Sequence, residues 1–565
     1  MPIFKRFVIL TLCTIGLFSC KTETKPNIIF ILTDDQRWDA LGFAGNEIIH
    51  TPEMDQLAKE GTYFKNAMVT TPICAASRAT LLTGLHERTH NFDFRAGDVR
   101  QEYMAASYPL LLKENGYHTG FFGKLGIKSA IKDTLFHQSE YYDRANEPDR
   151  KSYFYKTLGA DTVHLTRYTG QKALDFIDQS SGDEPFCLSL SFSAPHAADG
   201  AEDQYFWQEE TDYLFQDITI PEPLISHDSI FNKLPEKVKT GFNRLRWTWR
   251  YDTPEKYQHS VKGYYRMIAG IDLEIGKIRA KLKAQGIDKN TVIILMGDNG
   301  YFLGERQLAG KWLMYDNNLR VPLIINDPRT TKSSIVSDIA LNVDVPATIL
   351  SLAGIAKPAT WQGNSLLPYV NQDTNIKGRE STLVEHLWEF EHIPPSEGIR
   401  TKNLKYMRYI NDKTLEELYD LDNDPMELYN LAANLSWASA KSELKNTLAA
   451  YNTAYSDDYS KGPYALKVSS NSQPLLTWEI QEKAISQKAY QVLVASTAES
   501  LENNTGDLWN SGQVKSSELK TLYKGLALKK TEKYFWKVRI WDADNYTTNY
   551  SENMTLSIDQ TKRPL

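Results

Sequence analysis

The stretch Asn27-Ile28-Ile29-Phe30-Ile31-Leu32-Thr33-Asp34-Asp35 decides the fold class of this chain. Its continuous apolar run is typical of a strand buried on both faces, as in a parallel sheet covered by helices. Similar runs recur at Phe186–Phe192 and Thr291–Met296. Between the runs, Met54–Glu60 and Tyr265–Gln285 show helical spacing of apolar residues. This alternation of strands and helices predicts an α/β domain.

Polar residues follow each of the three apolar runs. Asp34-Asp35 ends the first, Ala194-Pro195-His196 follows the second, and Asp298-Asn299 follows the third. Ligands of open α/β sheets bind beyond the carboxyl ends of the strands, so we expect these side chains to converge. The acidic pairs offer only oxygen ligands, which suit a hard cation such as Ca²⁺ better than Zn²⁺. Strand-end capping and turn formation are the alternative explanation for each pair alone.

Residues 1–20 are predicted to be a lipoprotein signal peptide. Lys5 and Arg6 precede an apolar segment, Phe7–Phe18, which is shorter than the roughly 20 residues needed to span a bilayer. The following Leu17-Phe18-Ser19-Cys20 resembles a bacterial lipobox, which implies cleavage before Cys20 and lipidation of its thiol. An ordinary signal peptide is the alternative. We expect an exported lipoprotein anchored in a membrane, facing the periplasm or the outer-membrane surface.

The number of cysteines and the net charge limit the kinds of protein that this chain can be. The 565 residues include four cysteines, of which only Cys74 and Cys187 remain after residue 20, so no disulfide framework is expected. Cys187 lies in an apolar run and is interpreted as a small buried hydrophobic residue. Cys74 lies in a small, polar, loop-like segment. The net charge of −7 argues against a nucleic-acid partner, and an anionic substrate would need a local basic pocket.

The segment around Cys74 gives the most specific pattern in the sequence. It runs Cys74-Ala75-Ala76-Ser77-Arg78 and continues to Thr83-Gly84. A cysteine close to an arginine could be an ordinary activated thiolate. The segment resembles the signature of formylglycine-dependent type I sulfatases of the alkaline phosphatase superfamily, Cys-x-(Pro or Ala)-x-Arg followed by Thr-Gly. This resemblance implies that a formylglycine-generating maturation enzyme oxidises Cys74 to 3-oxoalanine.

The resemblance extends from Asn27 to about Asn452. The family's motifs appear in order at Asn115–Thr119, Gly123-Lys124, Ala194-Pro195-His196, Gly297–Gly300, Gly310-Lys311, Arg320–Leu323 and Leu418–Leu421. It implies an alkaline-phosphatase-like α/β/α sandwich over residues 26–345 and a smaller α+β subdomain over residues 346–455. It also implies a sulfuric ester hydrolase that acts on a sulfated polysaccharide or oligosaccharide.

The same resemblance assigns roles to residues of the site. Ca²⁺ would be bound by the residue made from Cys74 and by Asp34, Asp35, Asp298 and Asn299. The hydrated aldehyde at Cys74 would attack the sulfate sulfur, and Arg78 would orient it. Lys124 and Lys311 would hold the sulfate, and His196 with Lys311 would help the leaving alcohol take a proton. Each lysine alone would be interpreted as a solvated surface residue, so these roles depend on the whole set.

One position departs from the family pattern. The family usually has Gly-Lys-Trp-His where this chain has Gly123-Lys124-Leu125-Gly126. The missing histidine contacts the hydrated aldehyde in the family and is thought to assist its breakdown. His86 and His90 follow the signature and are possible substitutes, but the pattern does not transfer the role to either.

Residues 462–558 have a different residue pattern and are assigned to a separate C-terminal module. Alternating, aromatic-rich segments at Leu476–Ile480, Tyr490–Val494 and Tyr534–Trp541 predict an all-β sandwich of about 100 residues. The region resembles the fibronectin-III-like module of bacterial α-L-rhamnosidases. A sulfatase with such a module is similar to the ulvan-active sulfatases of marine Bacteroidetes, which implies ulvan, at rhamnose 3-sulfate, as the substrate. A generic spacer is the alternative.

Two other functions stay open on the sequence. One is a phosphodiester or phosphonate monoester hydrolase of the same superfamily, and the other is a non-catalytic glycan-binding lipoprotein. Additional candidates for substrate contact are His386, Trp388, Arg266 and Arg306.

Overall fold

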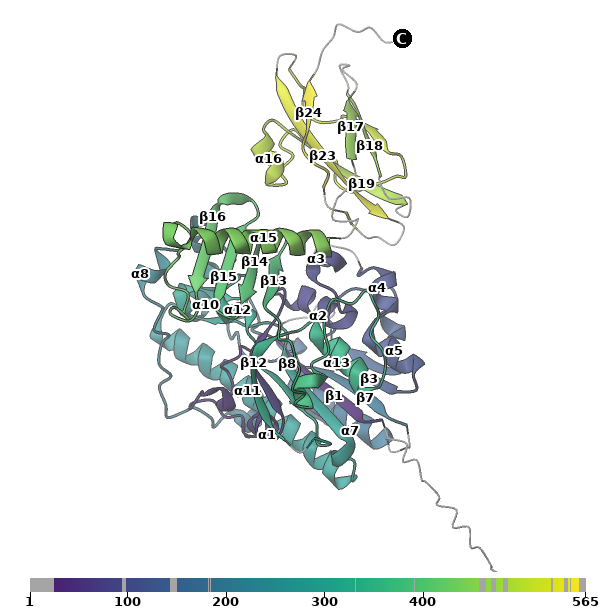
Figure 1. The fold of residues 1–565 in the computed structure, drawn as a ribbon, viewed down its shortest axis with the longest axis vertical. Helices are drawn as coiled ribbons and strands as arrows, with labels where there is room; N and C mark the ends of the chain where they lie inside the picture. Colours follow the sequence, from purple (N-terminus) through teal and green to yellow (C-terminus); the bar gives the residue numbers. More distant parts are fainter. Residues whose placement is uncertain are drawn as a thin grey trace, which may run out of the picture.

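A computed structural model describes residues 25–557 apart from 94–97, 143–149, 181, 183, 331, 391, 457–463, 469–473, 481–485, 530, 531, 543–546 and 549. Figure 1 shows a large α/β body and, at the yellow end of the chain, a smaller β-sandwich. Cys20, the predicted lipidation site, lies outside the described residues. Within them, no helix is both long and apolar enough to cross a membrane.

An eight-stranded mixed sheet forms the centre of the body. In spatial order its strands are β12 (Ser334–Leu341), β2 (Thr62–Met68), β11 (Leu323–Asn326), β8 (Thr291–Gly297), β1 (Asn27–Thr33), β7 (Phe186–Ser191), β3 (His118–Gly123) and β4 (Gln138–Tyr141). β1 lies between β7 and β8 and is parallel to both. The parallel pairing expected for the three apolar runs is confirmed, whereas β11, for which the sequence made no prediction, is antiparallel to its neighbours β8 and β2. The chain from β8 to β11 contains no long crossover helix, which a parallel return would need.

Helices cover both faces of this sheet. Ile29 and Ile31 of β1 face a core shared with α1 (Pro52–Glu60), α7 (Leu165–Gln179) and α11 (Pro254–Ala284). Ile28, Phe30 and Leu32 face a second core shared with α2 (Cys74–Thr83), α5 (Tyr108–Glu114) and α13 (Asp344–Leu352). Successive side chains of a strand point to opposite faces, so the apolar run of β1 supplies both cores. The α/β/α sandwich expected from the sequence is confirmed.

Helix α11 begins earlier than the sequence predicted. The apolar spacing starts at Tyr265, whereas the helix starts at Pro254. The Thr253 side chain accepts the backbone N–H of Lys256, and Pro254 occupies the first helical position. Both features favour a helix start. Tyr257, Val261 and Tyr264 continue the helical spacing of buried residues into this part of the helix.

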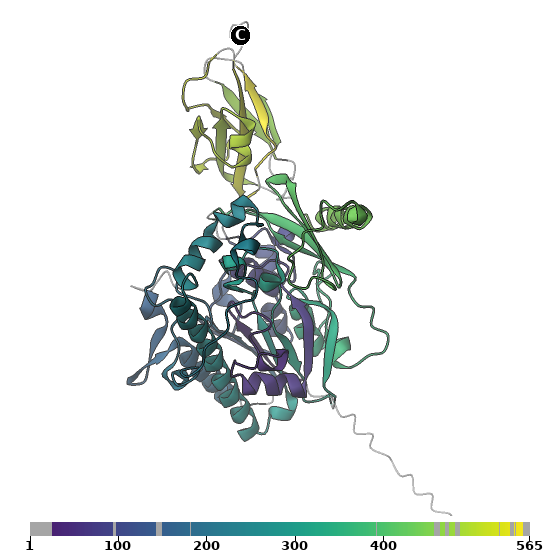
Figure 2. The same cartoon turned by 90° about the vertical axis from the view of Figure 1, so that its left-hand side faces the viewer.

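A four-stranded antiparallel sheet forms the C-terminal subdomain. Its strands are β13 (Ser381–His386), β14 (Ser396–Thr401), β15 (Leu404–Tyr409) and β16 (Asp412–Asp420). Helix α15 (Ala438–Tyr455) packs on one face through Leu444 and Leu448, and Figure 2 shows this green helix end-on beside the strands. The opposite face contacts Trp312 and Tyr315 of the α/β body.

The C-terminal module is an antiparallel β-sandwich, as predicted. One sheet contains β17 (Tyr464–Val468), β18 (Leu475–Glu479) and β22 (Lys520–Leu522). The other contains β20 (Trp509–Asn510), β19 (Gln487–Ala495), β23 (Lys533–Asp542) and β24 (Met554–Ser557), with β21 (Val514–Lys515) beside β19. Their inner faces share one core, in which Trp478 and Trp536 are buried. The alternation of apolar and polar residues allowed these strands to be predicted from the sequence.

Candidate active site

The carboxyl ends of β1 and β8 place four polar side chains together. The backbone N–H of Asp298 donates to the carbonyl of Thr33 (2.9 Å), and that of Asp35 donates to Asp298 Oδ1 (3.1 Å). Asn299 Nδ2 donates to Asp35 Oδ1 at 2.7 Å. These residues are about 264 positions apart in the chain, and they meet because adjacent parallel strands end at the same edge. Asp34, Asp35, Asp298 and Asn299 are all buried.

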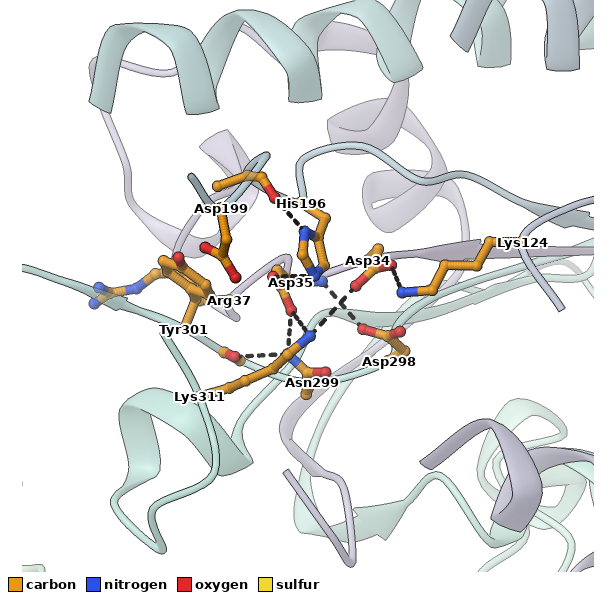
Figure 3. Close-up of polar contacts among 12 residues, drawn as sticks. Asp34, Asp35, Arg37, Lys124, His196, Asp199, Asp298, Asn299, Tyr301 and Lys311 are labelled. Atoms are coloured by element: carbon orange, nitrogen blue, oxygen red, sulfur yellow. Dashed lines mark hydrogen bonds and ion pairs between the residues drawn. The ribbon is translucent and has the colours of Figure 1, made fainter. Parts of the chain in front are cut away.

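Two lysines, Lys124 and Lys311, and one arginine, Arg78, surround these carboxylates. Lys124, which follows β3, forms an ion pair with Asp34 Oδ2. Lys311 Nζ lies 2.5 Å from Asp35 Oδ1 and 3.6 Å from Asp34 Oδ1. Figure 3 shows the two lysines reaching the aspartates from different sides. The cations and carboxylates together form one compact, buried charge cluster.

Arg78 of α2 joins the same cluster. Its Nε lies 2.8 Å from Asp298 Oδ2, and its Nη2 lies 3.6 Å from Asp34 Oδ2. Nη1 donates to the carbonyl of Lys124 at 2.6 Å and to the hydroxyl of Ser191. Arg78 therefore connects helix α2 to the ends of four strands, β1, β3, β7 and β8.

His196 contributes a ring nitrogen to the same place. Its Nδ1 is hydrogen-bonded to the carbonyl of Ala197 at 2.6 Å, so Nδ1 carries the proton and donates it. This fixes the tautomer and leaves Nε2, 3.7 Å from Asp35 Oδ2, facing the carboxylates. Figure 3 shows His196 and the aspartates pointing toward one another.

Burial and neighbouring charges set the ionisation of the aspartates. Burial opposes ionisation of Asp34, but Lys124, His196, Lys311 and Arg78 hold its pKa well below the usual range. Burial raises the pKa of Asp35, with Lys311 acting against it. Burial and the charge of Asp34 raise the pKa of Asp298 to about 6. An additional cation would favour the ionised form of all three carboxylates.

The donor set fits a hard cation. Asp34 Oδ1 and Asn299 Oδ1 are buried and have no hydrogen-bond partner, which is costly unless something else satisfies them. Ligand atoms of Asp34, Asp35 and His196 lie within 4.8 Å of one another. Carboxylate and amide oxygens dominate the set, as Ca²⁺ prefers. His196 enters this group although the sequence pattern assigned it only an acid role.

Cys74 is the first residue of helix α2 and is 4% exposed. The expectation of a loop-like segment is therefore wrong. Ala75 and Ala79 favour a helix and let it pack against the sheet without bulky side chains. A thiolate at Cys74 would raise the pKa of both Arg78 and Lys311, so the sulfur lies near the cluster. Cys187 is also buried, and neither cysteine forms a disulfide.

Gly126, where the family has a histidine, lies beside Arg78. A Cβ atom there would lie 2.5 Å from Arg78 Cδ, and the backbone has φ +73°. Neither possible substitute contacts the cluster: the ring nitrogens of His90 bond to Thr80 and the backbone N–H of Phe92, and His86 stacks on Tyr455. The structure thus fills the space next to position 126 with Arg78.

The sequence missed a second polar cluster behind His196. Asp199 accepts hydrogen bonds from Arg246 Nη2 (2.6 Å) and from Arg250, whose Nη1 also donates to Tyr301 at 2.9 Å. The two arginines lie one turn apart on α10 (Phe242–Arg250), and Asp199 follows His196 by three residues. The spacing of Arg246 and Arg250 was the only sign of this cluster in the sequence. It does not show that α10 contacts the segment that contains Asp199.

The four weaker candidates for substrate contact have internal partners. Arg306 is buried, donates to the carbonyls of Met426 and Glu427, and covers the ring of Tyr315. Arg266 donates to the carbonyl of Leu214 at 3.0 Å. His386 and Trp388 are buried against Trp312. Packing within the protein accounts for their conformations.

Family models match three segments of the chain. The model described as Sulfatase matches residues 26–355, and N-sulphoglucosamine sulphohydrolase, C-terminal, matches residues 304–454. The Rha78A-like, N-terminal immunoglobulin domain matches residues 463–558.

Curated relatives cover most of the chain at low identity. An N-acetylglucosamine-6-O-sulfatase of Bacteroides thetaiotaomicron is 28% identical, over 80% of this chain and 91% of the relative. An ulvan-active sulfatase of Formosa agariphila is 26% identical, over 80% and 88%.

Solved structures share the fold. One, determined in complex with its substrate D-glucosamine-2-N,6-O-disulfate, has a TM-score of 0.65 at 24% identity and covers 76% of this chain and 98% of its own. A phosphonate monoester hydrolase of Agrobacterium radiobacter has a TM-score of 0.63 at 20% identity, with 78% and 98% covered. A phosphonate monoester hydrolase therefore shares this fold, and the fold alone does not distinguish a sulfatase from such an enzyme.

Proposed function

This chain belongs to the sulfatase family and is a sulfuric ester hydrolase, and from that premise we propose that it uses a formylglycine made from Cys74 and a bound Ca²⁺. The observation that carries this proposal is the position of Arg78. It sits one turn along the helix that begins at Cys74 and pairs with Asp298 and Asp34. The nucleophile precursor and the oxygen-rich cluster therefore belong to one site.

The residues that would hold Ca²⁺ are Asp34, Asp35, Asp298 and Asn299, together with the residue made from Cys74. The unsatisfied oxygens of Asp34 and Asn299 support this assignment. When present, the formylglycine supplies a hydrated aldehyde as nucleophile, and Ca²⁺ offsets negative charge on the sulfate oxygens.

The remaining side chains bind the sulfate and move a proton. Lys124 and Lys311 now pair with carboxylates, and with the cation in place their ammonium groups are available to sulfate oxygens. Arg78 is fixed by the carbonyl of Lys124 and by Asp298, so it keeps its orientation. His196 Nε2 faces the cluster and, when both ring nitrogens are protonated, supplies a proton to the leaving alcohol. Because the charge cluster is buried, bulk water is excluded from it and each charge interaction within it is stronger.

For the substrate we propose ulvan, with sulfate removed from rhamnose 3-sulfate. Two findings support this choice: ulvan-active sulfatases are among the relatives, and the C-terminal module matches a rhamnosidase-type model. The test is sulfate release from ulvan oligosaccharides, measured by ion chromatography beside carrageenan, heparan and chondroitin fragments. Release only from one of the latter three would refute the ulvan assignment.

The formylglycine has its own test. After co-expression with a maturation enzyme, mass spectrometry of the Cys74 peptide should show the aldehyde in place of the thiol, and Cys74→Ala should abolish sulfate release. An unmodified thiol in an active preparation would overturn the proposal. Faster turnover of a phosphodiester or phosphonate monoester than of an aryl sulfate would favour the alternative hydrolase.

We also propose that Cys20 carries a lipid anchor that places the enzyme in a membrane facing the periplasm or the exterior. Metabolic labelling with a palmitate analogue should mark the wild-type protein and leave Cys20→Ala unlabelled. Labelling that survives this substitution would contradict the anchor.

A further inference from the structure

A cavity of about 860 Å³ lies where the α/β body meets the C-terminal subdomain. Its wall comes from β12, β13, α14 (Leu367–Val370), α15 and the segment between α14 and β13. This volume lies within the range of ligand-binding sites in proteins, roughly 300–1,000 Å³. The residues that matter below are His86, Asn364, Tyr369, Arg379, Tyr451 and Tyr455.

Helix α2 separates this cavity from the active site. Cys74 is the first residue of the helix, and His86, which lines the cavity, follows its last residue, Thr83. At 1.5 Å per residue, the ten-residue helix is about 15 Å long. The cavity therefore opens at the opposite end of α2 from the nucleophile precursor.

Aromatic rings form one side of the cavity. The rings of Tyr455 and His86 are stacked, with centroids 4.5 Å apart and planes at 26°, and Tyr451 packs against Tyr455 at 5.4 Å. His86 Nδ1 is buried and has no hydrogen-bond partner. Flat rings with polar edges suit a ligand that has both apolar faces and hydroxyl groups.

The charges of the lining balance. Arg379 pairs with both carboxylate oxygens of Asp344 at 2.7 Å. The lining has one further acid, Asp373, and one further cation, Lys377, which forms an ion pair with Glu380. Burial and the charge of Arg379 lower the pKa of His86 to about 3, so its ring is neutral at neutral pH. A free sulfate group would find no unpaired buried cation here. The lining instead offers amides, hydroxyls and aromatic rings, the groups that bind an uncharged sugar.

We propose that this cavity is a second, non-catalytic glycan site that binds an uncharged sugar unit of the polysaccharide, remote from the ester that is cleaved. Tyr455, which His86 supports from behind by stacking, packs against the sugar ring, and the exposed Asn364 amide bonds its hydroxyls. The identity of the glycan rests on the proposed function, but the site itself does not. Such a site would retain a long chain between successive cleavages and would raise affinity for polymer over short fragments.

The test measures binding of a desulfated ulvan tetrasaccharide by isothermal titration calorimetry. Cys74→Ala should bind it as well as the wild type. Asn364→Trp, which places a bulky ring in the cavity from an exposed position, should weaken binding at least tenfold, and Tyr455→Ala should do the same. Tyr213→Ala removes a tyrosine that is 67% exposed outside the lining, so it is the matched control and should bind normally.

Hydrolysis of 4-nitrophenyl sulfate separates this proposal from the proposed function. Asn364→Trp should keep the wild-type kcat/KM on this small ester, because the cavity lies beyond the far end of α2. Unchanged tetrasaccharide binding by Asn364→Trp, or no binding by any variant, would overturn the second site. A wild type that binds through this cavity but releases no sulfate would refute only the proposed function.

Discussion

Arg78 packs directly against Gly126: a Cβ atom at position 126 would meet Arg78 Cδ at 2.5 Å. The arginine is also held by hydrogen bonds to Asp298 and to the carbonyl of Lys124, so it has little freedom to move aside. The absence of a side chain at 126 is thus matched to the placement of Arg78. In this protein the departure from the family pattern is a packing relationship, and the buried charge cluster is arranged around it.

Adding a side chain at Gly126 should therefore displace Arg78. We expect Gly126→Ala to lower kcat on an aryl sulfate by about 100-fold, because small misplacements in an active site cost this much. Gly116→Ala is the matched control, since Gly116 also has a positive φ (+79°) but a Cβ atom added there would have nothing within 4 Å. Equal losses in both variants would show that backbone strain, and not the contact with Arg78, is responsible.

Removing Ca²⁺ should inactivate and destabilise the enzyme. A ligand at 100 times its Kd stabilises the folded state by about 2.7 kcal/mol, so Ca²⁺ added after chelation should raise Tm and restore activity. Asp34→Asn should lose the Tm response, because it removes a carboxylate at the centre of the cluster. The exposed Asp161 lies outside this site, and Asp161→Asn should respond like the wild type. A Tm response retained by Asp34→Asn would place the cation elsewhere.

Asp199 should be important for stability. Burial opposes its ionisation, but Arg246, Arg250 and His196 lower its pKa, so it is charged in the folded protein. Asp199→Ala leaves two buried guanidinium groups without their carboxylate, which should cost about 3–5 kcal/mol in the free energy of unfolding. Asp178→Ala removes an exposed partner of Lys281 and should cost about 1 kcal/mol or less. Urea denaturation of both variants measures the difference, and similar costs would contradict the prediction.

Glu416 should give the C-terminal subdomain a pH-dependent contribution to stability. Burial opposes its ionisation, but hydrogen bonds from Lys445, Tyr406 and Lys441 lower its pKa from 4.5 to about 2. Because the folded pKa is below the unfolded value, this contribution is complete above about pH 4.5 and is lost as the pH falls toward 2. The Tm of Glu416→Gln should therefore lie below that of the wild type at pH 7, with a gap that narrows below pH 4.5.

Glu443→Gln provides the control for this measurement. Glu443 lies on the same helix, α15, as Lys441 and Lys445, but it is exposed. Its substitution should leave Tm close to the wild-type value at every pH. A gap for Glu416→Gln that is constant from pH 7 to pH 3 would show that packing, and not ionisation, is the source of the effect.

The sequence by itself determined the α/β fold and the meeting of its polar strand ends. The apolar runs at β1, β7 and β8 are long and uninterrupted, as expected for strands that are buried on both faces. Once these strands are parallel neighbours, Asp34, Asp35 and Asp298 must share one edge of the sheet. No contact between side chains had to be known for that inference.

Only the tertiary structure decided how the site is packed. Cys74 looked like part of a loop because small polar residues suit both turns and tightly packed helices, and burial against the sheet selects the helix. The contact of Arg78 with Gly126 and the pairing of Asp199 with Arg246 join elements that are distant in the chain. Local residue patterns do not encode the paths of the intervening segments, and it is those paths, together with side-chain packing, that bring such residues within a few ångströms of each other.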